Sequence, residues 1–195
     1  MLKTPYIVAV SVALMATAHT AHAQEQDKYY AKLGANLSLS PSVKPSGLSK
    51  ILAKSGVMPE VTFGFNLDDG LAVELSYQKA GGALKETGMT GDLVFESIIV
   101  KAIYQLDVEN TAMYNPYLGL GLGNTTTKIS NFSGSSTSVQ ATLGNRFEFD
   151  QGWFGDLSAN YTHVGSATLK KSGSSSLKID ASSLTSVSFA IGKSF

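Results

Sequence analysis

The sequence predicts an all-β fold in which eight antiparallel strands form an up-and-down transmembrane β-barrel. Three observations carry this prediction: segments of about ten residues alternate between apolar and polar positions, the connections between them alternate in length, and the last strand runs to the final residue. In that strand Val187, Phe189, Ile191 and Phe195 share one face, and the opposite face carries only Ser, Ala and Gly. Small, uncharged side chains suit the crowded interior of a narrow barrel better than a water-exposed sheet face.

The first 23 residues have the features of a secretory signal peptide. Lys3 supplies a positive charge, residues 7–18 are apolar but short for a membrane-spanning helix, and Ala21-His22-Ala23 is a small-x-small cleavage site. We therefore expect a signal peptide at 1–23 and one barrel domain at 24–195. No later apolar stretch is long enough for a transmembrane helix, whereas barrel strands need only about nine to eleven alternating residues.

Eight strands are predicted in order along the exported chain. Their expected ranges are 29–39, 60–67, 71–78, 100–106, 116–127, 138–149, 153–163 and 185–195. In the fifth strand Leu118, Leu120 and Leu122 are expected to face lipid, while the glycines between them line the lumen and leave room for larger side chains. In the fourth strand the apolar run at 98–100 is expected to break the alternation.

The connections predict which rim of the barrel faces which compartment. Those at Asp68, Asp107 and Asp150 are short, that at 129–137 is intermediate, and those at 40–59, 79–92 and 164–180 are long. Short periplasmic turns and longer outer loops are typical of membrane barrels. A soluble eight-stranded carrier, with its apolar side chains inside, is the alternative that periodicity alone leaves open. The export signal, the terminal Phe and the weakly charged polar face favour the membrane barrel.

Two segments resemble a known family. The stretch Asn-Pro-Tyr-Leu-Gly-Leu-Gly-Leu-Gly at 115–123 and the C-terminal strand are similar to the OmpA-type, or opacity-protein, family of small eight-stranded barrels. The resemblance implies a monomer in a Gram-negative outer membrane, surrounded by lipid and lipopolysaccharide, whose last strand is recognised by the barrel assembly machinery. Lys193 departs from the family pattern, because an aromatic or apolar residue usually stands there.

Charged residues at inward positions predict an ion network in the lumen. The six positions are Lys32, Glu74, Lys101, Arg146, Glu148 and Asp156. Unpaired charges in a narrow interior are expensive, so we expect them to pair, and a turn at 150–152 sets Arg146 opposite Asp156. A structural plug is favoured over a gate or a pair of catalytic acids, because a lumen closed by ion pairs offers no substrate cleft.

Composition excludes several other kinds of chemistry. The chain has no cysteine, which excludes disulfides and thiolate sites, and its formal net charge of zero argues against a nucleic-acid binder. No cofactor or metal site is predicted. His163, with Ser158 and Ser166 nearby in sequence, leaves open a lipid-modifying enzyme, but no acid lies close to complete a triad, and a rim position is favoured.

Lysines gather in two of the long loops and acids in the short turns. Residues 41–58 hold Lys44, Lys50 and Lys54, and residues 164–179 hold Lys170, Lys171 and Lys178, with no acid in either segment. This pattern predicts attraction to anionic partners such as lipopolysaccharide phosphates or acidic host surface and matrix molecules. Ordinary solvation of exposed loops is the competing interpretation. The function we expect is structural and surface-exposed, with adhesion through these loops; a small porin-like channel is the alternative.

Overall fold

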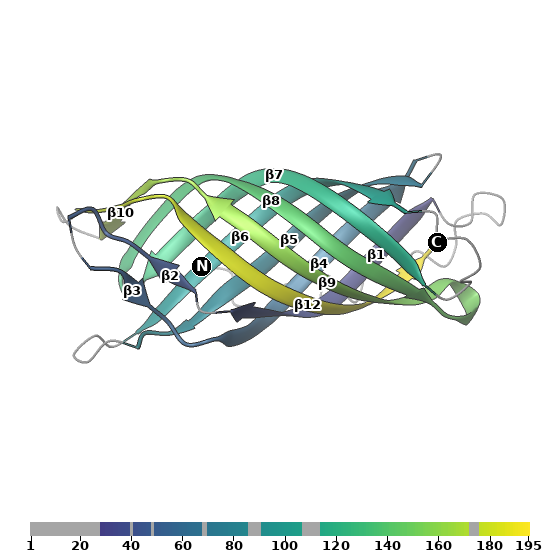
Figure 1. Cartoon of the computed structure of the whole chain (residues 1–195), viewed down its shortest axis with the longest axis horizontal. Coiled ribbons are helices and arrows are strands. Elements are labelled where there is room, and N and C mark those ends of the chain that lie inside the picture. The colour runs from purple at the N-terminus through teal and green to yellow at the C-terminus, as the bar shows by residue number, and fades with distance from the viewer. Residues whose placement is uncertain are drawn as a thin grey trace.

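The computed structural model of the chain is a closed antiparallel β-barrel (Figure 1). The structure describes residues 28–39, 41–47, 49–67, 70–85, 91–106, 114–171 and 176–195. The signal peptide expected at 1–23 lies outside these ranges. Within the ranges given, no helix has the length and apolar character needed to cross a membrane.

Eight long strands form the wall, and each pairs with the neighbouring strands of the ring. They are β1 (Tyr29–Leu39), β4 (Gly56–Asn66), β5 (Leu71–Ala83), β6 (Asp92–Gln105), β7 (Asn115–Ile129), β8 (Phe132–Glu148), β9 (Trp153–Val164) and β12 (Ser182–Ser194). The pairing of β12 with both β1 and β9 closes the ring. Closure leaves the wall without a free strand edge in hydrocarbon, where unpaired backbone groups are costly. The predicted eight-stranded barrel is confirmed.

The outward and inward faces of the strands are as the alternation predicts. Leu120 and Leu122 are 70% and 65% exposed on the outer surface, while Gly119 and Gly121 are buried inside. A Cβ atom at Gly121 would lie 2.6 Å from Cγ of Lys101, so the glycine leaves the space that this lysine occupies. The apolar-out arrangement is that of a membrane barrel and excludes the soluble-carrier alternative.

The expected irregularity in the fourth strand is wrong. β6 begins at Asp92 and alternates regularly: Ile98 and Val100 face outward, and Ile99 lies inward with no exposed surface. The period of two was hidden because the inward face of this strand is itself apolar at several positions. An apolar residue on both faces produces a continuous hydrophobic run even in a regular strand.

Two of the segments expected to be long loops contain strands that the sequence analysis missed. β2 (Ser42–Val43) pairs with β3 (Ile51–Leu52), and β10 (Ala167–Lys171) pairs with β11 (Ser176–Ile179). We call the described residues of 41–54 and 167–179 the outer extension. In Figure 1 it lies at the end of the barrel opposite the C-terminus.

The outer extension continues the barrel wall. β10 pairs with the outer end of β8. A bridge between Pro45 and Ile179 links β11 to the segment after β2. A second bridge, between Ala53 and Leu84, links the segment after β3 to the end of β5. Backbone bonds of 2.9 Å (Ser46 to Lys178) and 2.8 Å (Lys54 to Ala83) reinforce these links. The described part of the extension is therefore held to the wall by backbone pairing.

The described short turn between β8 and β9 is a single 3-10 turn, Asp150–Gly152. Phe149 donates its backbone N–H to the carbonyl of Trp153 at 2.7 Å, and Gln151 adopts a left-handed conformation with φ of 62°. This turn sets the register in which β8 faces β9. The acidic turn positions Asp68, Asp69 and Asp107 lie outside the described residues.

Candidate functional site

Hydrogen-bonded polar side chains fill the middle of the lumen. Thr62 and Ser76 lie 2.8 Å apart through their hydroxyl oxygens, and Ser97, Thr125 and Ser138 form a chain of hydroxyls at 2.8 and 2.9 Å. All five side chains are buried. Eight strands enclose an interior just wide enough for side chains, and these residues occupy it.

A buried ion network lies on the periplasmic side of this polar layer. Lys32 Nζ is 2.6 Å from Glu74 Oε1 and 3.2 Å from Asp156 Oδ2, and Lys101 Nζ is 2.9 Å from Glu74 Oε2. None of the four residues is more than 4% exposed. Lys32 on β1 thus joins acids on β5 and β9, which pins strands from different sides of the ring together.

Two phenols, which the sequence analysis did not assign to the network, complete it. The Tyr30 hydroxyl donates to Glu74 Oε1 at 2.8 Å, and the Tyr117 hydroxyl donates to Asp156 Oδ1 at the same distance. The alternation of inward and outward residues along a strand could have located them, because Tyr30 and Tyr117 fall on the inward faces of β1 and β7. Glu74 and Asp156 then each have both a cation and a neutral donor, as buried charges require.

The expected Arg146–Asp156 ion pair is not formed, although the two residues are opposite in register as predicted. Both oxygens of Asp156 are occupied, one by Lys32 and the other by Tyr117. The Arg146 guanidinium instead lies over the rings of Tyr30 and Phe154, with its central carbon 4.4 and 4.3 Å from their centroids. Strand register fixes which residues are neighbours, but here side chains from across the narrow lumen compete for the same acid.

Glu148 does not belong to the buried network. It is exposed at the periplasmic mouth, and no ion pair within 4.0 Å joins it to a described residue. Glu148 is the last residue of β8, where the wall ends and water reaches the side chain. A different acid, Glu60, is buried in the lumen and accepts a hydrogen bond from Ser188 at 2.7 Å. Glu60 was not among the predicted inward charges, although the alternation of the strand predicted at 60–67 places it on the same face as Thr62 and Gly64.

An apolar cluster fills the outer end of the barrel. It combines inward residues of the wall with residues of the outer extension: Val43, Ile51, Ala53, Ala80, Leu93, Phe95, Ile129, Val164, Ala167, Leu169, Ile179 and Leu184. Leu93, Leu169 and Ile179 have no exposed surface. The lumen is therefore occupied in layers, with charges near the periplasm, hydroxyls and amides in the middle, and packed hydrocarbon at the outer end.

The six predicted lysines all belong to the outer extension and are exposed. Lys44, Lys50 and Lys54 lie in the segment of β2 and β3, Lys170 and Lys171 on β10, and Lys178 on β11. None of them forms an ion pair with a described residue. Two other outer lysines, Lys79 and Lys128, differ because each forms an ion pair with Glu96, at 3.0 and 2.6 Å.

The family to which the chain belongs follows from a match over most of its length. The model for the outer membrane protein beta-barrel domain matches residues 8–188. The chain belongs to this family. It is a protein of the bacterial outer membrane, which confirms the predicted family, fold class and location.

Solved structures of other small barrels have the same fold. Neisserial surface protein A is 17% identical, with a TM-score of 0.64 over 88% of this chain and 100% of that one. OprG from Pseudomonas aeruginosa is also 17% identical, with a TM-score of 0.64 over 87% and 96%. Ail of Yersinia pestis, in complex with the heparin analogue sucrose octasulfate, is 18% identical with a TM-score of 0.50 over 88% and 100%. No curated protein matches the chain.

The position of His163 in this outer-membrane barrel does not favour the enzyme alternative. His163 is exposed on the outward face near the end of β9, opposite Ser183 on β12 and Val139 on β8. Neither neighbouring strand places an acid opposite His163. Among the described residues, no group of three or more His, Cys, Asp or Glu side chains could hold a metal ion. A triad needs a nucleophile, base and acid in mutual reach, which this position does not offer.

Proposed function

We propose that this protein is a structural, surface-exposed barrel whose outer extension binds anionic molecules at the cell surface. The observation that carries the proposal is the set of six exposed lysines, unpaired among the described residues, on a paired and packed outer extension. A surface held by backbone pairing and a core keeps its cations in fixed relative positions, so less entropy is lost when a polyanion binds. Clustered charge of one sign also speeds the encounter with an oppositely charged partner.

Sulfated or acidic host-surface polysaccharides are the partners we favour. Several cations on neighbouring strands match the repeated charges of such a chain: Lys178 lies beside Ser46, and Lys44 beside Asp180, across the contact of β11 with the segment after β2. The complex of Ail with a heparin analogue offers a precedent on the same fold. In this proposal the protein acts as a monomer, lipopolysaccharide surrounds its outer rim, and its last strand is the part that the barrel assembly machinery recognises.

A small porin-like channel is less well supported. The apolar cluster at the outer end and the ion network near the periplasm both occupy the lumen. A solute would have to cross both layers in turn. The likeness to OprG concerns the fold at 17% identity and carries no activity to this chain.

Binding to immobilised heparin tests the proposal, with a matched pair of variants. In the first variant Lys44 and Lys178 become Gln; in the second, Lys79 and Lys128 become Gln. Both lose two positive charges at the outer end, but only the first pair is unpaired in the protein. We expect the first to weaken binding severalfold more than the second, and wild-type binding to weaken as salt rises, because salt screens exposed charges over about 8 Å at physiological ionic strength.

Replacing all six lysines by Gln gives the complete test. We expect that variant to lose heparin binding while its barrel still folds, as judged by its heat-dependent migration in detergent gels. Binding that is unchanged in the six-lysine variant, or equally weakened by the two matched pairs, would rule out the outer extension as the binding surface.

A further inference from the structure

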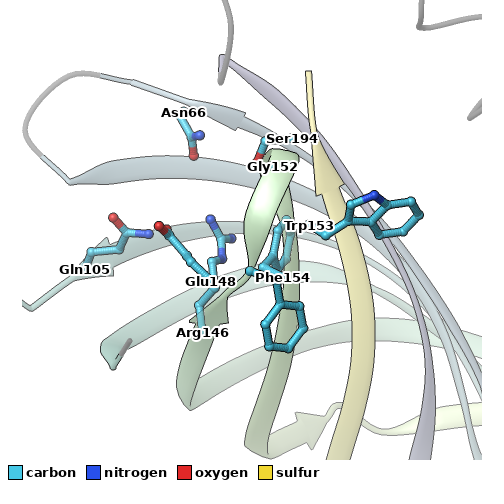
Figure 2. Close-up of a pocket in the computed structure, with 9 residues that line it drawn as sticks. Asn66, Gln105, Arg146, Glu148, Gly152, Trp153, Phe154 and Ser194 are labelled. Carbon is cyan, nitrogen blue, oxygen red and sulfur yellow. The ribbon is translucent and has the colours of Figure 1, made fainter. Parts of the chain in front are cut away.

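A small cavity opens at the periplasmic mouth of the barrel, at the opposite end from the lysines. Its volume is about 280 Å³. Figure 2 shows its lining side chains, which come from the ends of five strands and from the β8–β9 turn. The lining residues are Asn66, Gln105, Arg146, Glu148, Phe149, Gly152, Trp153, Phe154 and Ser194. A space of this size accommodates a molecule of a few non-hydrogen atoms, near the lower limit of ordinary ligand sites.

Arg146 is the buried cation of this cavity and has no anionic partner within 4.0 Å among the described residues. It is only 5% exposed, and its Nε atom has no hydrogen-bond partner. The guanidinium is held between aromatic rings, which orient it but supply no negative charge. Arginine cannot escape this cost by losing its proton, since the guanidinium stays charged in proteins.

Arg146 is also left out of the pairing in the network near the periplasm. That network contains three buried cations, Lys32, Lys101 and Arg146, and two buried acids, Glu74 and Asp156. The two lysines and the two acids pair with one another. The third buried acid of the lumen, Glu60, accepts a hydrogen bond from Ser188 and forms no ion pair with Arg146. Among the described residues no anion therefore lies within 4.0 Å of Arg146, and a buried charge without a close partner is unfavourable.

Glu148 limits what kind of anion fits. It follows Arg146 by two residues on the same face of β8, yet it is exposed and forms no ion pair with Arg146. A fixed negative charge at the entrance repels a doubly charged ion more strongly than a singly charged one. The ring of Phe154 lines the same cavity and suits a short hydrocarbon tail, whereas the ring of Trp153 projects to the far side of β12 (Figure 2).

We propose that this cavity is a binding site for a small monocarboxylate that enters from the periplasm. The carboxylate meets the guanidinium of Arg146, whose planar fork of N–H donors matches its two oxygens. The amide of Gln105 and the hydroxyl of Ser194 are further donors in the lining, and the tail lies against Phe154. Glu148 acts as the element that excludes dianions.

Isothermal titration calorimetry provides the readout. Refolded protein in detergent is titrated at constant ionic strength, and the heat of binding is followed. Propionate is the probe, and propionamide is its neutral counterpart of the same shape. We expect a saturable change with propionate and none with propionamide. A wild-type protein that does not respond to propionate, or responds equally to propionamide, would overturn the proposal.

Variants then assign the response to the two charged residues. Arg146→Gln is expected to abolish propionate binding, and Arg146→Lys, which keeps the charge but loses the fork, to weaken it at least tenfold. Glu148→Gln is expected to let sulfate bind, which wild type rejects. Lys85→Gln, an exposed lysine just past the outer end of β5, serves as the control and should match wild type.

Two outcomes would contradict the assigned class of ligand. Tighter binding of sulfate than of propionate by wild type would make this a dianion site, and tighter binding of alanine would make it a zwitterion site that uses Glu148 as well as Arg146. If Arg146→Gln fails to fold, the comparison of Arg146→Lys with wild type decides the role of Arg146, and unchanged affinity in that variant would refute it.

Discussion

Lys32 is the residue on which the buried charges of the barrel depend. It is the cation within 3.2 Å of both Glu74 and Asp156, whereas Lys101 contacts Glu74 alone. Removing one partner of a buried pair leaves an uncompensated charge, which typically costs about 3–5 kcal/mol. The strongest electrostatic link in the lumen is therefore expected between β1 and its partners across the ring rather than between adjacent β8 and β9.

A pair of double-mutant cycles tests this assignment. Lys32→Met combined with Asp156→Asn is expected to show a coupling free energy of about 0.5–3 kcal/mol, the range for residues in one ion network. Arg146→Met combined with Asp156→Asn should give a smaller coupling, because Asp156 has no ion pair with Arg146. The measurement is the free energy of unfolding in lipid or detergent for each single and double variant. An Arg146 coupling that equals or exceeds that of Lys32 would show that the pair expected from strand register dominates after all.

At the scale of the elements, the sequence predicts the strands where the two faces differ and fails where they do not. β1 and β9 alternate cleanly between lipid-facing apolar residues and polar lumen residues, and their predicted ranges agree with the structure to within one residue. The outer ends of β5 and β6 were missed because Ala80, Leu93 and Phe95 are apolar and inward. β2 and β3 have two residues each, too few to show any period.

The same limit applies to the candidate site. The alternation of inward and outward positions along each strand identified four inward charges that the structure brings together: Lys32, Glu74, Lys101 and Asp156. This alternation gives no information on which of several charges around a closed ring come into contact. The partner predicted for Asp156 was therefore wrong. The periplasmic cavity was beyond prediction, because its lining comes from the ends of five strands that only barrel closure places side by side.

The packing of the outer extension can be tested through Phe95, an inward residue of β6 that is 1% exposed in the apolar cluster. Phe95→Ala is expected to cost about 3–5 kcal/mol of local packing and so to loosen the extension. Because the extension carries exposed lysines, trypsin reports its opening directly. We expect cleavage at 41–54 and 167–179 to be slow in wild type and fast in Phe95→Ala.

Ile98→Ala provides the matched control for Phe95→Ala. It removes an apolar side chain from the same strand, but Ile98 faces outward and is 57% exposed. This variant should be cut as slowly as wild type. Rapid cleavage of wild type, or equal cleavage of the two variants, would mean that the extension behaves as a solvated loop and does not present its lysines in fixed positions.

At the scale of the whole molecule, the layers of the lumen separate the two ends of the barrel. Packed hydrocarbon closes the outer end, hydroxyl and amide groups fill the middle, and ion pairs bind the wall together near the periplasm. The two candidate binding surfaces, the lysines outside and Arg146 inside, therefore face different compartments. A ligand of one end would have to cross these layers of described side chains to reach the other.

Single-channel recording is the test of this closed arrangement. We expect purified, refolded protein in a planar bilayer to show no conductance steps, because ions would have to cross a desolvated apolar cluster and then a layer of paired charges in series. Phe95→Ala should also remain silent, since it loosens only the outer layer and leaves the contacts of Lys32 with Glu74 and Asp156 intact. A large general porin inserted into the same bilayer is the positive control. Reproducible, stable steps from the wild-type protein would show that the layers open in the membrane, and the channel alternative would then replace the structural role proposed for this barrel.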